Sequence, residues 1–360
     1  MSGPRVRPDL EAIPVYRPGR ALAPRDARSF KCSSNENPFP PLPSVVAAIT
    51  AAAAEVNRYP DLGSSRLVEA LAHRYRVAAD RVVCGPGSVG VLQQLVAAVA
   101  APGDEVVFAW RSFEAYPIVT RVAGATAVGV PLAAGGRHDL AAMAAAVTPR
   151  TRAVLVCTPN NPTGPSVAAD ELAAFVAAVP DEVLVVVDEA YAELVRDPAA
   201  ADGTALLDAH PHVAVLRTFS KAYGLAGLRV GYGLLPPQVA TAVRRTSIPF
   251  WVSSVAEAAA LAALRAEEEL FDRVDTLVAE RERVLTALRA DGWDVPDSEA
   301  NFVWLPAGER SDELATACAA VGVAVRTFPG EGVRVTVAEP EANDRWLQAA
   351  APFAAPPSAA

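Results

Sequence analysis

Short runs of apolar residues, each long enough for one strand, recur between residues 105 and 234. They occupy residues 105–109, 125–131, 153–157, 183–187, 213–216 and 228–234. Around them, apolar residues recur at helical spacing over residues 90–100, 139–147, 168–179 and 237–246. Continuous apolar strands that alternate with helices are typical of a mainly parallel sheet buried between helices. The pattern therefore predicts an α/β fold, with earlier helices beginning near Ser44 and Ser64 and with Ser64 or Ser65 as an N-cap.

The pattern changes after about residue 249. A long helical stretch over residues 254–289 carries charges at helical spacing. Short strands follow near 301–305, 323–326 and 333–337, with a helix from Asp312. A chain of 360 residues allows about two domains. We expect a proline- and arginine-rich N-terminal arm at 1–40, packed with the small domain, a large domain at 41–248 and a small α+β domain at 249–360.

Composition and charge limit the classes of partner. Hydrophobic residues make up 52% of the sequence and charged residues 20%, as expected for a globular chain with a large core. A formal net charge of −9 argues against nucleic acid or an anionic membrane as partner. No apolar run reaches the ~18 residues of a membrane span, and no secretory signal pattern is present. The four cysteines and four histidines lack metal-ligand spacing, so we expect a reduced, cytoplasmic protein without a metal site.

A candidate reactive lysine follows the expected strand at 213–216. Lys221 is preceded by Ser220 and followed, after a glycine-containing spacer, by Arg229. A lysine amine condenses with an aldehyde once burial or a neighbouring cation lowers its pKa. A hydroxyl and a guanidinium beside it suit a phosphate group. Taken alone, the segment is equally compatible with a surface lysine in a loop.

Two further polar segments follow expected strands. Residues 185–191 read Val-Val-Val-Asp-Glu-Ala-Tyr, which places Asp188 at the carboxyl end of a strand, where ligands bind in open α/β sheets. A carboxylate there pairs with a protonated pyridine nitrogen, or it caps the helix that follows. Residues 157–164 read Cys-Thr-Pro-Asn-Asn-Pro-Thr-Gly, a composition that an ordinary turn also explains.

Glycines at positions 85, 87 and 90 lie where an expected strand gives way to a helix. Free backbone N–H groups and the helix dipole at such a junction favour a phosphate. The spacing also satisfies the dinucleotide pattern Gly-x-Gly-x-x-Gly, which requires an acidic residue at the end of the next strand. That strand begins at Glu105 and is followed by Trp110, so the dinucleotide interpretation is weak.

Together these segments resemble the motifs of fold-type I pyridoxal-phosphate (PLP) aminotransferases, in the histidinol-phosphate aminotransferase branch. The resemblance runs in the family's order from Val-Tyr-Arg-Pro-Gly at 15–19 to Arg334, and it includes Asn-Glu-Asn-Pro at 35–38 and Tyr-Pro-Asp at 59–61. The run Trp-Arg-Ser-Phe-Glu-Ala-Tyr at 110–116 is most similar to actinobacterial aromatic (phenylalanine-type) aminotransferases. The resemblance implies PLP as the cofactor and a large domain whose mainly parallel, seven-stranded-type sheet is sandwiched by helices.

The resemblance also implies roles for individual residues. The catalytic residue is Lys221, which holds the cofactor as a Schiff base and then shuttles the proton. The cofactor-binding set is Gly87, Ser88 and Val89 through their backbone, Phe113, Asn161, Asp188, Tyr191, Ser220, Lys221, Arg229 and, from a neighbouring subunit, Tyr59. The substrate-binding set is Arg334 for the α-carboxylate, with Asn35, Tyr16 and Arg326. Tyr59 implies a homodimer with shared active sites, on whose partner subunit the arm also packs.

One motif departs from the family pattern. Relatives usually carry Asp-Glu after the position of Ser88, whereas this chain has Val89 and Gly90. Backbone contacts to a phosphate survive that change, but any side-chain contact from the two missing acids does not.

The activity expected is transamination of an aromatic L-amino acid with 2-oxoglutarate. The alternative is histidinol-phosphate aminotransferase, whose phosphate-bearing substrate needs an extra anion site, with Arg326, Tyr16 or Asn35 as candidates. A PLP-dependent decarboxylase acting on a phosphorylated amino acid shares the scaffold and is a further alternative. A PLP-binding regulator is disfavoured, because the acidic chain has no basic DNA-binding domain.

Overall fold

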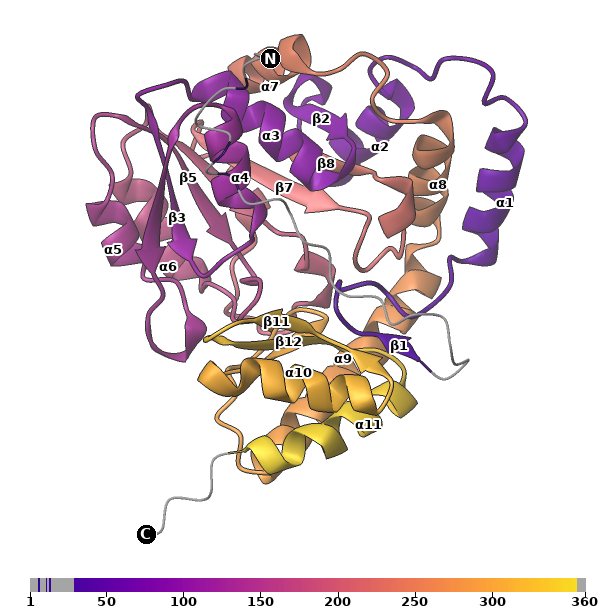
Figure 1. The fold of residues 1–360 in the computed structure, drawn as a ribbon. Coiled ribbons are helices and arrows are strands. Elements are labelled where there is room, and N and C mark those ends of the chain that lie inside the picture. Colours follow the sequence, from indigo (N-terminus) through magenta and orange to yellow (C-terminus); the bar gives the residue numbers. More distant parts are fainter. Residues whose placement is uncertain (1–5, 7–10, 12, 14–28, 355–360) are drawn as a thin grey trace, which may run out of the picture.

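A seven-stranded sheet forms the centre of the computed structural model, which describes residues 29–354 together with residues 6, 11 and 13 (Figure 1). The strand order is β2-β8-β7-β6-β5-β3-β4. Six of these strands run in one direction and β8 runs in the opposite one, so the expected mainly parallel sheet is confirmed. The strands are β2 (Val82–Gly85), β3 (Glu105–Trp110), β4 (Thr126–Pro131), β5 (Thr151–Cys157), β6 (Leu184–Asp188), β7 (Val213–Thr218) and β8 (Gly231–Leu234).

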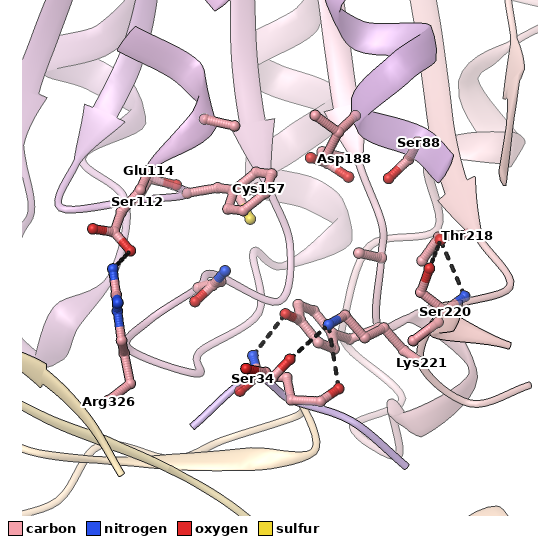
Figure 2. Close-up of a pocket in the computed structure, with 18 of the residues that line it drawn as sticks. Ser34, Ser88, Ser112, Glu114, Cys157, Asp188, Thr218, Ser220, Lys221 and Arg326 are labelled. Atoms are coloured by element: carbon pink, nitrogen blue, oxygen red, sulfur yellow. Dashed lines mark hydrogen bonds and ion pairs between the residues drawn. The ribbon is translucent and has the colours of Figure 1, made fainter. Parts of the chain in front are cut away.

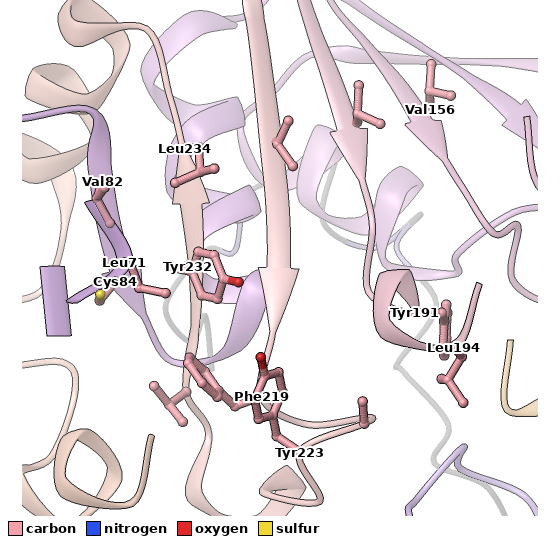
Figure 3. Packing of buried hydrophobic residues seen from close by; sticks show 14 of the residues in the cluster. Leu71, Val82, Cys84, Val156, Tyr191, Leu194, Phe219, Tyr223, Tyr232 and Leu234 are labelled. Atoms are coloured by element: carbon pink, nitrogen blue, oxygen red, sulfur yellow. The ribbon is translucent and has the colours of Figure 1, made fainter. Parts of the chain in front are cut away.

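The apolar runs form central strands because both faces of the sheet are covered. In β5, Val154 and Val156 belong to one buried cluster, and Leu155 between them belongs to another. Side chains alternate across a strand, so a strand buried on both faces must be apolar at every position. Figure 3 shows the first cluster, where Leu71 packs beside Val82 and Tyr232.

Two groups of helices supply these faces. Those on the side of the first cluster are α1 (Pro43–Ala53), α2 (Ser65–Tyr75), α5 (Leu140–Ala145), α6 (Ala169–Ala178) and α8 (Ser254–Arg265). Those on the side of the second are α3 (Gly87–Val99), α4 (Ala115–Val122) and α7 (Pro237–Thr246). Burial of the apolar stripe of each helix against the sheet stabilises both elements.

The structure corrects two expectations about helix ends. Ser64 does not cap α2 with its side chain: its φ of 50° is left-handed, and the Asp61 carboxylate accepts the hydrogen bond from the Ser65 N–H instead. The single helix expected over 254–289 is broken at Ala266, whose φ of −107° and ψ of 27° leave the helical region. The new helix, α9 (Glu267–Ala290), begins with Glu267, which pairs with Arg74 and accepts a hydrogen bond from Tyr223.

The C-terminal residues form a separate sheet, in the order β11-β12-β9, with its own buried cluster. The strands are β9 (Phe302–Leu305), β11 (Arg326–Phe328) and β12 (Gly332–Thr336), and the helices beside them are α10 (Ser311–Ala320) and α11 (Pro340–Ala350), the latter not expected from the sequence. The strand expected at 323–326 is divided, because β10 (Val323–Ala324) pairs in parallel with β1 (Phe30–Lys31) instead. The boundaries of the arm and the two domains stay predictions.

Of the helices in the described part of the chain, none combines the length and the apolar character needed to cross a membrane.

Candidate active site

A cavity of about 490 Å³ lies at the carboxyl edge of the seven-stranded sheet. Parallel strands end at the same edge, so the loops after β2, β3, β5, β6 and β7 converge there. The residues at 33–36 and the strands β11 and β12 contribute the opposite wall (Figure 2). The predicted site residues that line the cavity are Asn35, Ser88, Val89, Phe113, Asn161, Asp188, Tyr191, Ser220, Lys221, Arg229, Arg326 and Arg334.

Lys221 stands just after β7 and extends into the cavity (Figure 2). Its Nζ donates to the carbonyl oxygens of Ser34 at 3.3 Å and Asn35 at 3.2 Å. Burial, followed by the positive charge of Arg334, lowers the pKa of Lys221 to about 7. A large fraction of the amine is therefore neutral near neutral pH, and only the neutral amine can act as nucleophile or base.

Asp188 is the last residue of β6, and its carboxyl group is buried at the cavity wall. Oδ2 accepts a hydrogen bond of 2.9 Å from the hydroxyl of Tyr116, while Oδ1 has no hydrogen-bond partner among the described residues. Burial raises the pKa of Asp188 to about 6, although the Tyr116 hydrogen bond acts in the opposite direction. A buried carboxylate oxygen without a partner is an acceptor for a ligand N–H.

Sequence reasoning missed Tyr116, whose ring is fully buried in α4. The Tyr116 ring packs edge-on against Phe113, with 5.7 Å between the ring centroids. The signal that was available is the hydroxyl itself, since a buried tyrosine usually has a hydrogen-bond partner.

An anion cradle lies between Ser220, Arg229 and the start of α3. Arg229 Nη1 lies 3.3 Å from Ser220 Oγ, and the Thr218 hydroxyl lies 3.0 Å from the same oxygen. Gly87 has a φ of +75°, and a Cβ atom on it would lie 2.5 Å from Arg229 Nη2. Gly87 itself is not a lining residue of the described cavity, but its lack of a side chain lets the guanidinium approach the helix start.

The segment at 33–36 is tied to the groups around the lysine. Asn35 Nδ2 donates to the Tyr191 hydroxyl at 2.9 Å. Arg334, which is buried, donates to Asn161 Oδ1 at 2.6 Å and to the Ser33 carbonyl at 2.8 Å. Burial raises the pKa of Tyr191, so its hydroxyl stays protonated and can donate a hydrogen bond.

Tyr59, a predicted site residue, is not among the described residues that line this cavity. Tyr59 is 83% exposed and its ring stacks on that of Phe250, with 4.7 Å between the centroids. Its proposed contact with the cofactor of a neighbouring subunit stays a prediction. Tyr16 lies outside the described residues.

Comparisons with known proteins agree on one family. Residues 29–349 match the family Aminotransferase class I and II. An aromatic amino acid aminotransferase from Streptomyces avermitilis is 55% identical over 347 residues, 96% of this chain and 97% of that protein. A protein of the same name from Thermobifida fusca is 58% identical, with 96% of each chain covered. The crystal structure of histidinol-phosphate aminotransferase from Sinorhizobium meliloti in complex with PLP is 30% identical, with a TM-score of 0.86 and 98% of both chains covered.

The residues present fit PLP. The partnerless Asp188 Oδ1 suits the protonated pyridine nitrogen, and the hydroxyl and guanidinium of the anion cradle suit the phosphate. The Lys221 amine, with its lowered pKa, lies in the same cavity and suits the aldehyde. The chain belongs to the class I and II aminotransferase family and is a PLP-dependent aminotransferase of fold type I.

Proposed function

We propose that the enzyme transaminates aromatic L-amino acids with 2-oxoglutarate, which gives an aryl-pyruvate and L-glutamate. The observation that carries this proposal is the apolar part of the cavity wall. Ile118, Val119 and Phe328 line the cavity and supply apolar surface for a ring, while the positive charge of Arg326 is balanced by Glu114. The names of the relatives from Streptomyces and Thermobifida support the same substrate class.

When bound, PLP supplies an aldehyde carbon that takes up the substrate's amino group and a protonated pyridine ring that withdraws electrons. Arg334 is proposed to bind the substrate carboxylate through its guanidinium fork and so to orient the Cα–H bond toward Lys221. The neutral Lys221 amine removes that proton from Cα and delivers it to the aldehyde carbon of the cofactor. The Ser34 and Asn35 carbonyls hold Nζ in place. Ionised Asp188 keeps the proton on the ring nitrogen, and the segment at 33–36 shields the site from water.

We also propose a homodimer with shared active sites. Val56, Tyr59, Leu62 and Ile248 are exposed large apolar side chains, and Phe250 stacks on Tyr59. Apolar side chains gathered on the surface favour a protein contact. In this arrangement Tyr59 serves the neighbouring subunit's cofactor phosphate.

The test is kcat/KM for phenylalanine, tyrosine and histidinol phosphate, each with 2-oxoglutarate, on PLP-loaded protein. We expect the two aromatic acids to exceed histidinol phosphate by more than about tenfold, because a buried pocket built for one side-chain chemistry discriminates by at least ~1.4 kcal/mol. The reverse order would assign the enzyme to histidinol phosphate. Release of CO₂ without formation of a keto acid would assign it to decarboxylation.

A further inference from the structure

One ion pair in the cavity joins the start of α4 to the three-stranded sheet. Glu114 follows Phe113 at the start of α4, and Arg326 is the first residue of β11. Arg326 Nη2 donates to Glu114 Oε2 at 2.7 Å, and both residues line the cavity. Figure 2 shows the pair on the side of the cavity away from Lys221, Ser220 and Thr218. It therefore lies where the side chain of a bound amino acid extends, rather than where its amino group reacts.

The Glu114–Arg326 ion pair is partly shielded from solvent, so its charges can act on a ligand in the cavity. The side chain of Arg326 is 14% exposed and that of Glu114 is 31% exposed. The guanidinium carbon of Arg326 lies 5.7 Å from the ring centroid of Phe328, so its surroundings are partly apolar. Charges in such surroundings are screened less than charges on an open surface.

We propose that Glu114 determines the charge specificity of the enzyme by selecting neutral substrate side chains over anionic ones. With Glu114 in place, the far wall of the cavity is electrically balanced, and an aromatic ring packs against it without displacing a charge. An anionic side chain is repelled by the Glu114 carboxylate and must compete with it for Arg326. The inference rests on the proposed function, because it explains how a cavity that contains an arginine favours a neutral ring.

The same reasoning applies to the proposed amino acceptor. The second carboxylate of 2-oxoglutarate also reaches this wall, and it must share or replace Glu114 on Arg326. Glu114 therefore raises the KM for 2-oxoglutarate as well, although less than for a phosphate group, which carries more charge.

The chain offers a matched control. Arg111 forms an ion pair with Glu331 near the Glu114–Arg326 pair, and its guanidinium carbon lies 5.6 Å from the ring of Phe328. Neither Arg111 nor Glu331 is among the described residues that line the cavity. Glu331→Gln thus removes an equivalent carboxylate without changing the cavity wall.

The experiment compares wild type, Glu114→Gln and Glu331→Gln as PLP-loaded proteins. We expect Glu114→Gln to raise the ratio of kcat/KM for histidinol phosphate to that for phenylalanine about tenfold or more, because a partly exposed carboxylate of like charge is removed and no longer competes for Arg326. The KM for 2-oxoglutarate falls in the same variant. The double variant Glu114→Gln/Arg326→Gln loses most of the gain, because the anionic group then has no Arg326 guanidinium to bind. An unchanged ratio in Glu114→Gln, or an equal change in Glu331→Gln, overturns the proposal.

A binding measurement separates this inference from the proposed function. Titration calorimetry with glutarate and 3-phenylpropionate, which have no amino group to react, reports the effect of Glu114 whatever substrate the enzyme turns over. We expect Glu114→Gln to bind glutarate about tenfold more tightly and 3-phenylpropionate within about twofold of wild type. If both ligands change alike, the charge argument is wrong. If glutarate alone gains while phenylalanine is not a substrate of the wild type, the charge argument stands and the aromatic assignment fails.

Discussion

The hydrogen bond from Tyr116 to Asp188 makes a prediction that is specific in both size and pH. Tyr116→Phe deletes a buried hydroxyl that donates to Oδ2 at 2.9 Å. A hydrogen bond to a charged group contributes ~1.5–3 kcal/mol, and one pKa unit corresponds to ~1.4 kcal/mol. Because the lost donor favoured the ionised carboxylate, the pKa of Asp188 should rise from about 6 to between about 7 and 8 in the cofactor-free protein.

The sign of the effect on stability follows from linkage. Burial already holds the pKa of folded Asp188 above its ordinary value of 3.8, so the cofactor-free wild type loses stability as the pH rises through about 6. In Tyr116→Phe the loss continues to a higher pH. The difference in unfolding free energy between the two proteins should therefore grow by ~1.5–3 kcal/mol between pH 5.5 and 8.5.

Urea denaturation of the cofactor-free proteins, at one protein concentration and several pH values, measures this difference. The control repeats Tyr116→Phe in an Asp188→Asn background, where the partner cannot ionise. There the cost of the substitution should not depend on pH, since the cycle isolates the Tyr116–Asp188 interaction. Two results would refute the reasoning. One is a loss of stability from Tyr116→Phe that does not depend on pH when Asp188 is present. The other is the same pH dependence with Asp188 and with Asn at position 188.

Three further predictions concern catalysis. Lys221→Ala should abolish turnover and the visible absorbance of the bound cofactor while leaving the circular dichroism spectrum unchanged; turnover near the wild-type rate would remove the lysine from its assigned role. Mixing Lys221→Ala with Tyr59→Ala subunits should restore activity, because a hybrid dimer contains one site with both native residues, and no recovery above the parents would contradict shared sites. Arg334→Gln should lower kcat/KM about a hundredfold, since a charge-assisted pair of hydrogen bonds to the substrate carboxylate, worth ~3 kcal/mol, is lost. The loss should be similar for every amino acid tested. A loss confined to amino acids with one kind of side chain would mean that Arg334 does not bind the α-carboxylate.

The central sheet could be predicted because its inner strands contain continuous apolar runs. Val185, Val186 and Val187 cannot all face one core, so a run of this kind implies burial on both faces. The position of β8 in the sheet and its reversed direction could not be predicted, since strand order depends on which strands meet in space. The break at Ala266 was missed for a related reason. Alanine favours helix locally, and contacts of Glu267 with Arg74 and Tyr223 accompany the change in the chain's course.

The candidate site divides in a similar way. That Lys221, Asp188 and Asn161 line one cavity could be predicted, because each lies in a short motif at or just after the end of a strand and one sheet edge brings them together. Tyr116 and Glu114 were missed because their importance comes from partners distant in the sequence. Tyr116 is 72 residues from Asp188, and Glu114 is 212 residues from Arg326. Neither pairing leaves a local pattern in the sequence.

The parallel pairing of β1 with β10 has a consequence for the order of events during synthesis. The carbonyls that hold Lys221 come from residues 34 and 35, and Asn35 is in turn held by Thr336 and Asn301. A nascent chain that has completed the seven-stranded sheet still lacks β10 and β12, and with them the anchors of its own N-terminal segment. The Ser34 and Asn35 carbonyls therefore reach their places beside Lys221 only when β10 and β12 have left the ribosome, so the hydrogen bonds of the reactive lysine are completed only in the finished chain.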